Sequence, residues 1–160
     1  MKIKGIIDED FVNFKLPSMV VEFPFCNFKC EKECGIEGIC QNHSLIDTPP
    51  MDIPVEVIVN RFLNNKISKA LVCQGLEPFD SFDDLYEMIT TLRIRSSCLE
   101  PVVIYTGYTE EEIADKIEML KTLKHIYVKF GRFKPNDTPH FDNVLGVTLV
   151  SSNQYGKLIC

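Results

Sequence analysis

Apolar residues in this chain fall into short continuous runs, which predict buried strands at residues 19–23, 70–72, 102–105 and 126–128. Runs of this kind are typical of parallel strands that are buried on both faces. Residues 2–15 alternate only loosely and predict a hairpin or an edge strand. Residues 144–150 predict a last extended segment.

Three segments between these runs carry apolar residues at helical spacing. The first begins at Pro54, which suits the first turn of a helix. The second follows Asp80 and Ser81, which can cap a helix, and the third follows the capping box of Thr109 and Glu112. Their apolar faces are Val55, Ile58, Val59, Phe62 and Leu63; Phe82, Leu85, Ile89 and Leu92; and Ile113, Ile117 and Leu120. Alternating strands and helices predict an α/β fold with a mostly parallel sheet and flanking helices.

The whole chain, residues 1–160, reads as a single domain, because no linker or internal repeat divides it. No apolar run is long enough to span a bilayer, so we expect no membrane partner. The net charge of −6 argues against nucleic-acid binding, which needs a basic surface. The N-terminus has no secretory signal pattern, so we expect a cytoplasmic protein whose thiols stay reduced.

Polar, glycine and cysteine motifs follow the predicted strands, at residues 26–40, 74–78, 105–108, 131–133 and 151–154. Ligands of parallel sheets gather at the carboxyl ends of the strands. These motifs therefore predict one shared site at one edge of the sheet.

Four of the seven cysteines lie within fifteen positions, as Cys26, Cys30, Cys34 and Cys40. Such clustering in a polar loop indicates ligands of a metal ion or an iron–sulfur cluster. Disulfides and unrelated free thiols are the alternatives. Four thiolates also make a complete tetrahedral zinc site, so a zinc-binding structural or interaction module is a competing hypothesis.

The motifs together resemble the radical S-adenosylmethionine (SAM) superfamily and, within it, the activating proteins of anaerobic ribonucleoside-triphosphate reductase. The resemblance is carried by Cys26-Asn27-Phe28-Lys29-Cys30 with Cys40-Gln41-Asn42, Gly75-Leu76-Glu77-Pro78, Tyr105-Thr106-Gly107-Tyr108, and Gly131-Arg132-Phe133 with Ser152-Asn153-Gln154. It implies a partial (β/α) barrel, a 4Fe-4S cluster and SAM as cofactors. It further implies that SAM is cleaved reductively to methionine and a 5′-deoxyadenosyl radical.

The implied partners are an anaerobic ribonucleoside-triphosphate reductase, which receives a glycyl radical, and a reductant such as flavodoxin or ferredoxin. Another small radical SAM enzyme, acting on a different glycyl radical protein or on a small molecule, is the alternative within the superfamily.

The chain departs from the family pattern at the cluster motif. Cys26 and Cys30 keep the usual first gap, whereas Cys34 comes one residue late and Cys40 follows a nine-residue gap. Ile39 and Gln41-Asn42 flank Cys40 as in the family, so the resemblance favours Cys40 as the third ligand, with Cys34 as the alternative. Phe130 also stands where the family has an acidic residue.

The resemblance implies that cofactor binding falls to Phe28, Gly75, Glu77, Tyr105, Thr106, Asn153 and Gln154. Glu77 would accept a hydrogen bond from the ammonium group of SAM. Leu76 replaces a family glycine, and we expect its side chain to turn into the core and leave Glu77 free to bind.

Overall fold

The structure is a computed structural model that describes residues 1–160. Its strands are β1 (Lys2–Ile3), β2 (Gly5–Asp10), β3 (Ser18–Phe23), β4 (Met51–Asp52), β5 (Ala70–Gly75), β6 (Val102–Tyr105), β7 (Ile126–Phe130), β8 (His140–Asp142), β9 (Val147–Leu149) and β10 (Tyr155–Leu158). Its helices are α1 (Lys29–Cys34), α2 (Val55–Asn64), α3 (Phe82–Thr90) and α4 (Ala114–Leu120). Short 3₁₀ turns lie at His43–Ile46, Pro78–Ser81, Glu111–Ile113 and Lys121–Leu123, and a π-helical turn at Thr91–Arg95 extends α3.

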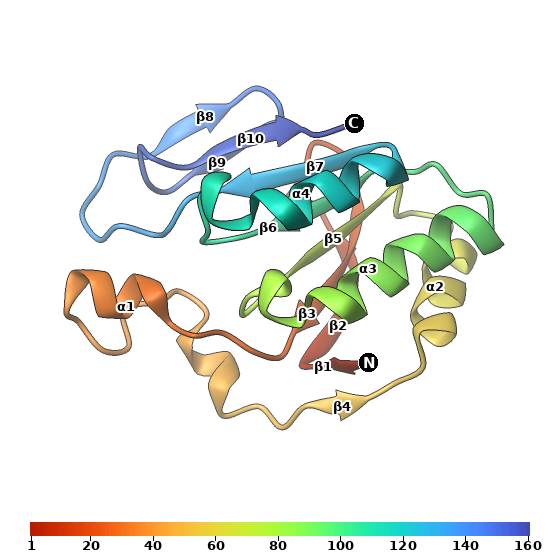
Figure 1. Ribbon diagram of the computed structural model, residues 1–160, viewed down its shortest axis with the longest axis horizontal. Coiled ribbons are helices and arrows are strands. Elements are labelled where there is room, and N and C mark those ends of the chain that lie inside the picture. The colour runs from red at the N-terminus through yellow and green to blue at the C-terminus, as the bar shows by residue number, and fades with distance from the viewer.

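The central sheet has six strands in the order β10-β7-β6-β5-β3-β2 (Figure 1). β3, β5, β6 and β7 are parallel neighbours, while β2 and β10 pair antiparallel at the two edges. The predicted α/β class with a mostly parallel sheet is thus confirmed, and the 2–15 segment forms the antiparallel edge with β3. The parallel arrangement brings the carboxyl ends of β3, β5, β6 and β7 to one side of the molecule.

The extended segment predicted at residues 144–150 is confirmed only for β9, Val147–Leu149. β9 pairs with β8 in a separate two-stranded sheet and does not join the central sheet. The sheet edge is instead formed by β10, which pairs with β7. β10 consists of Tyr-Gly-Lys-Leu and is largely exposed, so it carries no apolar pattern that could reveal a strand.

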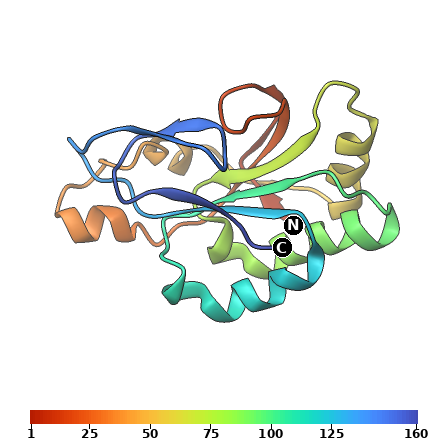
Figure 2. The ribbon, with the colours of Figure 1, turned by 90° about the horizontal axis from the view of Figure 1, so that it is seen from above.

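Both faces of the central sheet are buried. Side chains on successive strand residues point to opposite faces, so Leu71 and Cys73 join a cluster of 25 buried residues that includes the apolar sides of α2, α3 and α4. Ala70 and Val72 join a smaller cluster of seven residues on the other face. Figure 2 shows α3 and α4 on one side of the sheet, with the β2–β3 loop and β8 on the other. Burial on both sides explains the continuous apolar runs.

Local signals set the helix boundaries. Pro54 lies at the N-cap of α2 in extended backbone, one residue before the first turn in which the sequence places it. The capping box is confirmed, since the Thr109 N–H donates to the Glu112 carboxylate (2.9 Å) and the Glu112 N–H donates to the Thr109 hydroxyl (3.4 Å). The cysteine loop also contains a short helix, α1, that its sequence pattern does not predict. None of the helices has the length and apolar character needed to cross a membrane.

Candidate functional site

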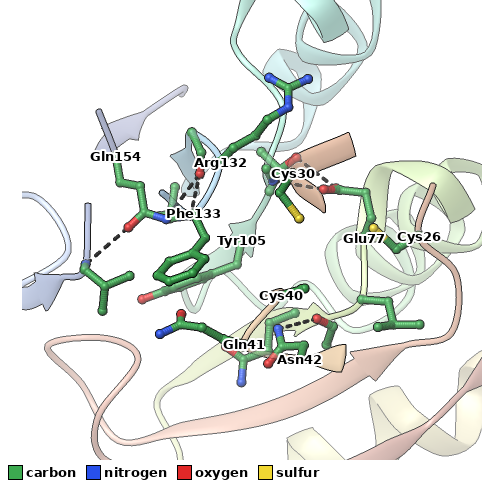
Figure 3. Close-up of a pocket in the computed structure, with 18 of the residues that line it drawn as sticks. Cys26, Cys30, Cys40, Gln41, Asn42, Glu77, Tyr105, Arg132, Phe133 and Gln154 are labelled. Atoms are coloured by element: carbon green, nitrogen blue, oxygen red, sulfur yellow. Dashed lines mark hydrogen bonds between the residues drawn. The ribbon is translucent and has the colours of Figure 1, made fainter. Parts of the chain in front are cut away.

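A cavity of about 240 Å³ lies at the carboxyl ends of the parallel strands. Residues from the cysteine loop, from the ends of β5, β6 and β7, and from β9 line it. Figure 3 shows Cys26 and Cys30 on one side of this cavity and Tyr105, Phe133 and Gln154 on the other. The predicted meeting of the strand-end motifs at one edge of the sheet is confirmed, because all five segments contribute lining residues, the last of them through Gln154 alone.

Three of the four clustered cysteines line the cavity, namely Cys26, Cys30 and Cys40. The Cys34 thiol does not line it and instead donates weakly to the backbone carbonyl of Glu31 (3.6 Å). Cys40 therefore lies at the cavity and Cys34 does not, although sequence spacing alone leaves the two as alternatives.

The thiols at the cavity are partly buried. Burial raises the pKa of Cys26 to about 12. Burial, and then the neighbouring Cys40 thiol, raise the pKa of Cys30 to about 11. The side chains are not gathered into a closed metal site, since no group of three His, Cys, Asp or Glu residues is close enough to hold a metal ion as it stands. Binding a metal or cluster therefore requires both deprotonation of the thiols and a local adjustment of the loop.

Glu77 ties together the ends of β5 and β6. Its carboxylate accepts hydrogen bonds from the Phe79 N–H (3.1 Å), the Thr106 hydroxyl (2.8 Å) and the Gly107 N–H (2.9 Å). The side chain is buried, and burial raises the pKa of Glu77 to about 7. Glu77 lines the cavity but is not free, because three donors already hold it.

Gly75 ends β5 in a conformation that suits glycine, with φ at +95°. A Cβ here would lie 2.8 Å from the Phe23 nitrogen, so the close approach of β5 to β3 requires glycine. The expectation for Leu76 is wrong: it is half-buried, stays outside the hydrophobic core cluster and lines the cavity. The turn at Gly75 directs the chain toward the cavity, which explains this position.

Tyr105 and Thr106 both line the cavity as the sequence predicts. The Tyr105 hydroxyl donates to the Asn13 carbonyl (2.6 Å) in the loop after β2. Thr106 is buried and uses its hydroxyl on Glu77. The aromatic ring of Tyr105 thus offers a fixed wall for a ligand, whereas Thr106 mainly holds Glu77 in place.

The remaining residues that were predicted to bind the cofactor are Phe28, Asn153 and Gln154, and their side chains are either outside the cavity or already hydrogen-bonded. Gln154 lines the cavity, but its side-chain oxygen accepts from the N–H groups of Val150 and Ser151 and its amide donates to Gly131. Phe28 and Asn153 are not among the residues that line the cavity. A ligand role for Phe28, Asn153 and Gln154 stays a prediction.

Lys129 was not predicted from sequence, yet it lines the cavity. It is 8% exposed, and its ammonium group donates to the Gly131 carbonyl (2.8 Å). No carboxylate forms an ion pair with it, and burial lowers the pKa of Lys129 to about 8. A lysine inside the apolar run of β7 was the available signal, since lysine is seldom buried.

Arg132 fastens the cysteine loop to the rest of the site. Its guanidinium pairs with Glu112 (2.6 Å) ahead of α4 and with Glu33 (3.2 Å) in α1. Lys29, also in α1, pairs with the same Glu112. These ion pairs hold α1 against the opening of the cavity.

Comparison with known proteins gives one match. A family model described as a 4Fe-4S single cluster domain matches residues 19–154. No curated protein and no solved structure matches the chain. The matched region runs from β3 to the end of the cavity lining and includes all four clustered cysteines. The chain therefore belongs to the 4Fe-4S single cluster domain family.

Proposed function

We propose that this chain is a radical SAM enzyme that holds a 4Fe-4S cluster on Cys26, Cys30 and Cys40. The observation that carries this proposal is that these three thiols line the same cavity as the ends of β5, β6 and β7. Thiolates are the usual protein ligands of iron–sulfur clusters, and three of them leave one of four irons open to another ligand. The sequential parallel strands β3, β5, β6 and β7, with helices over one face, also fit a partial (β/α) barrel.

The cluster would supply the electron that cleaves the sulfonium carbon–sulfur bond of SAM. The residues around it would bind and orient SAM and keep water out. The burial that raises the pKa of Cys26 and Cys30 fits such a shielded site, in which cluster binding would displace the thiol protons.

Two opposite charges suit the amino-acid end of SAM. A carboxylate has about four acceptor positions, and Glu77 uses three of them, which leaves one for an ammonium group. Lys129 has three donors and spends one on Gly131, so it can donate to a carboxylate. In this proposal Glu77 and Lys129 bind the two charged groups of the methionine part, and Tyr105 contacts the nucleoside.

The biological role that we propose is activation of an anaerobic ribonucleoside-triphosphate reductase, on which the enzyme would generate a glycyl radical. The reductant would be a small electron carrier such as flavodoxin or ferredoxin. The ordered motifs that resemble the activating proteins support this role, and the compartment that we propose is the cytoplasm.

Anaerobic reconstitution with iron and sulfide tests the cluster and its ligands. Iron content and electron paramagnetic resonance should show a cluster in the wild type and in Cys34→Ala, which is the matched control, but not in Cys26→Ala, Cys30→Ala or Cys40→Ala. Full loading of Cys40→Ala together with loss in Cys34→Ala would contradict the ligand set. A protein that binds only zinc would instead favour a structural zinc module.

Cleavage of SAM tests the reaction. With a strong reductant and without oxygen, the loaded protein should convert SAM to methionine and 5′-deoxyadenosine. A fully loaded protein that forms no 5′-deoxyadenosine with any reductant would refute the radical SAM proposal.

A further inference from the structure

The segment between Cys30 and Cys40 leaves the cavity and returns to it. Nine residues separate the two cysteines, and α1 carries the chain away from Cys30. Gly35 and Gly38 then adopt positive φ angles of 69° and 74°, which glycine does at little cost. These two turns reverse the chain, and Cys40 comes back beside the start of α1.

The buried carboxylate of Glu31 contacts the chain at Cys40, where it returns to the cavity. Glu31 lies next to Cys30 in α1 and is 9% exposed. Its Oε1 accepts a hydrogen bond from the Cys40 N–H (3.3 Å) and contacts Nδ1 of His43 at 2.8 Å. Glu31 is therefore held as an acceptor by Cys40 itself and by His43.

His43 completes this attachment. Its backbone N–H donates to the Cys40 carbonyl (3.0 Å), and its ring lies 6.0 Å from the Phe28 ring. The neighbouring Asn42 side chain donates to the Gly75 carbonyl at the end of β5 (2.6 Å). The segment around Cys40 is thus fastened both to α1 and to the central sheet.

We propose that Glu31 and His43 are positioning residues that hold Cys40, rather than Cys34, at the cavity beside Cys30. This inference rests on the proposed function, in which Cys40 is a cluster ligand. A ligand that is distant in sequence must be ordered at an entropic cost, and the Glu31–His43 pair provides that order before a cluster binds. Groups that orient ligands in this way commonly change metal affinity by about 10- to 100-fold when they are removed.

The metal-free protein provides the first test. Anaerobic alkylation with iodoacetamide, followed by peptide mass spectrometry, measures how fast each cysteine reacts. Glu31→Ala and His43→Ala should each speed the labelling of Cys40 at least about threefold while leaving buried Cys73 unlabelled, which shows that the core remains folded. Glu31→Gln should stay within about twofold of the wild type, because its amide oxygen can accept the same two contacts. Glu37→Ala, in the same loop and exposed, is the matched control.

Reconstitution provides the second test. Iron retained during challenge with a chelator should fall about tenfold or more in Glu31→Ala and His43→Ala, and should be close to wild type in Glu31→Gln and Glu37→Ala. Wild-type Cys40 labelling and wild-type iron retention in Glu31→Ala would overturn the inference. A wild-type protein that loads no cluster would overturn the proposed function instead, and the alkylation rates would still report whether Glu31 and His43 hold Cys40.

Discussion

Replacing Lys129 with methionine should stabilise the metal-free protein. Lys129 is 8% exposed, and burial lowers its pKa from 10.5 to about 8. That shift corresponds to about 3 kcal/mol of unfavourable free energy when the ammonium is charged in the folded state at pH 7. Methionine has a similar length and no charge, so it fills the same space without this cost.

One hydrogen bond is lost in the Lys129→Met variant, and it offsets part of the gain. The lost bond to the Gly131 carbonyl contributes about 1 kcal/mol. The Gly131 carbonyl keeps a partner, because the Gln154 amide also donates to it (3.3 Å). The expected net gain in the free energy of unfolding is about 2 kcal/mol at pH 7, or about 4–8 °C in Tm for a protein of this size.

The pH dependence separates this electrostatic cause from better packing. Between the folded pKa of about 8 and the unfolded value of 10.5, the unfolded chain holds a proton on Lys129 that the folded chain has lost. The stability of the wild type therefore rises with pH across that window, and its deficit is greatest below pH 8. The advantage of Lys129→Met should be close to zero at pH 10.

Urea unfolding of the metal-free protein, kept reduced and without oxygen, measures both quantities. Lys66→Met is the matched control, because Lys66 is exposed, and its stability should stay within about 0.5 kcal/mol of the wild type. A Lys129→Met variant that is less stable than the wild type at pH 7, or one whose advantage is as large at pH 10, would refute the reasoning.

If Lys129 binds the carboxylate of SAM as proposed, the stabilised variant should also bind SAM at least about tenfold more weakly, which is a loss of about 1.4 kcal/mol.

Three further predictions concern stability and thiol reactivity. Gly75→Ala should lower the free energy of unfolding in urea by about 2–4 kcal/mol, because its Cβ would meet the Phe23 nitrogen at 2.8 Å. Gly35→Ala is the control: Gly35 also has a positive φ but no atom within 4 Å of the added Cβ, so this variant should lose only about 1 kcal/mol. Equal losses in the two variants would show that the contact with β3 is unimportant. Thr109→Ala should cost about 1 kcal/mol in thermal unfolding through loss of the capping box, and an unchanged Tm would argue against it. Cys26 in the metal-free protein should react with iodoacetamide at pH 8 at least about tenfold more slowly than glutathione, since burial raises its pKa to about 12; rapid labelling would contradict this.

The sequence alone determined the elements whose signals are local. The apolar runs of β3, β5, β6 and β7 and the helical spacing of α2 and α3 each record burial on a regular element, so they can be recognised without knowing the neighbours. The capping box before α4 depends on backbone chemistry within a few residues, and it too is visible in sequence. Clustered cysteines indicated metal chemistry because packing gives no reason for such spacing.

Tertiary structure decided what depends on distant parts of the chain. β10 became the sheet edge because β7 offered an unpaired side, although Tyr155–Leu158 has no strand pattern of its own. Cys40 rather than Cys34 lines the cavity, and the Glu31 carboxylate holds it there by accepting a hydrogen bond from the Cys40 N–H. This contact cannot be derived from the spacing of the cysteines in sequence. The position of Lys129 within the apolar run of β7 indicates in sequence that it is buried, but only the fold shows that it lies in the cavity wall without a carboxylate partner. Long-range contacts fix these positions, since they are made only when segments far apart in sequence pack together.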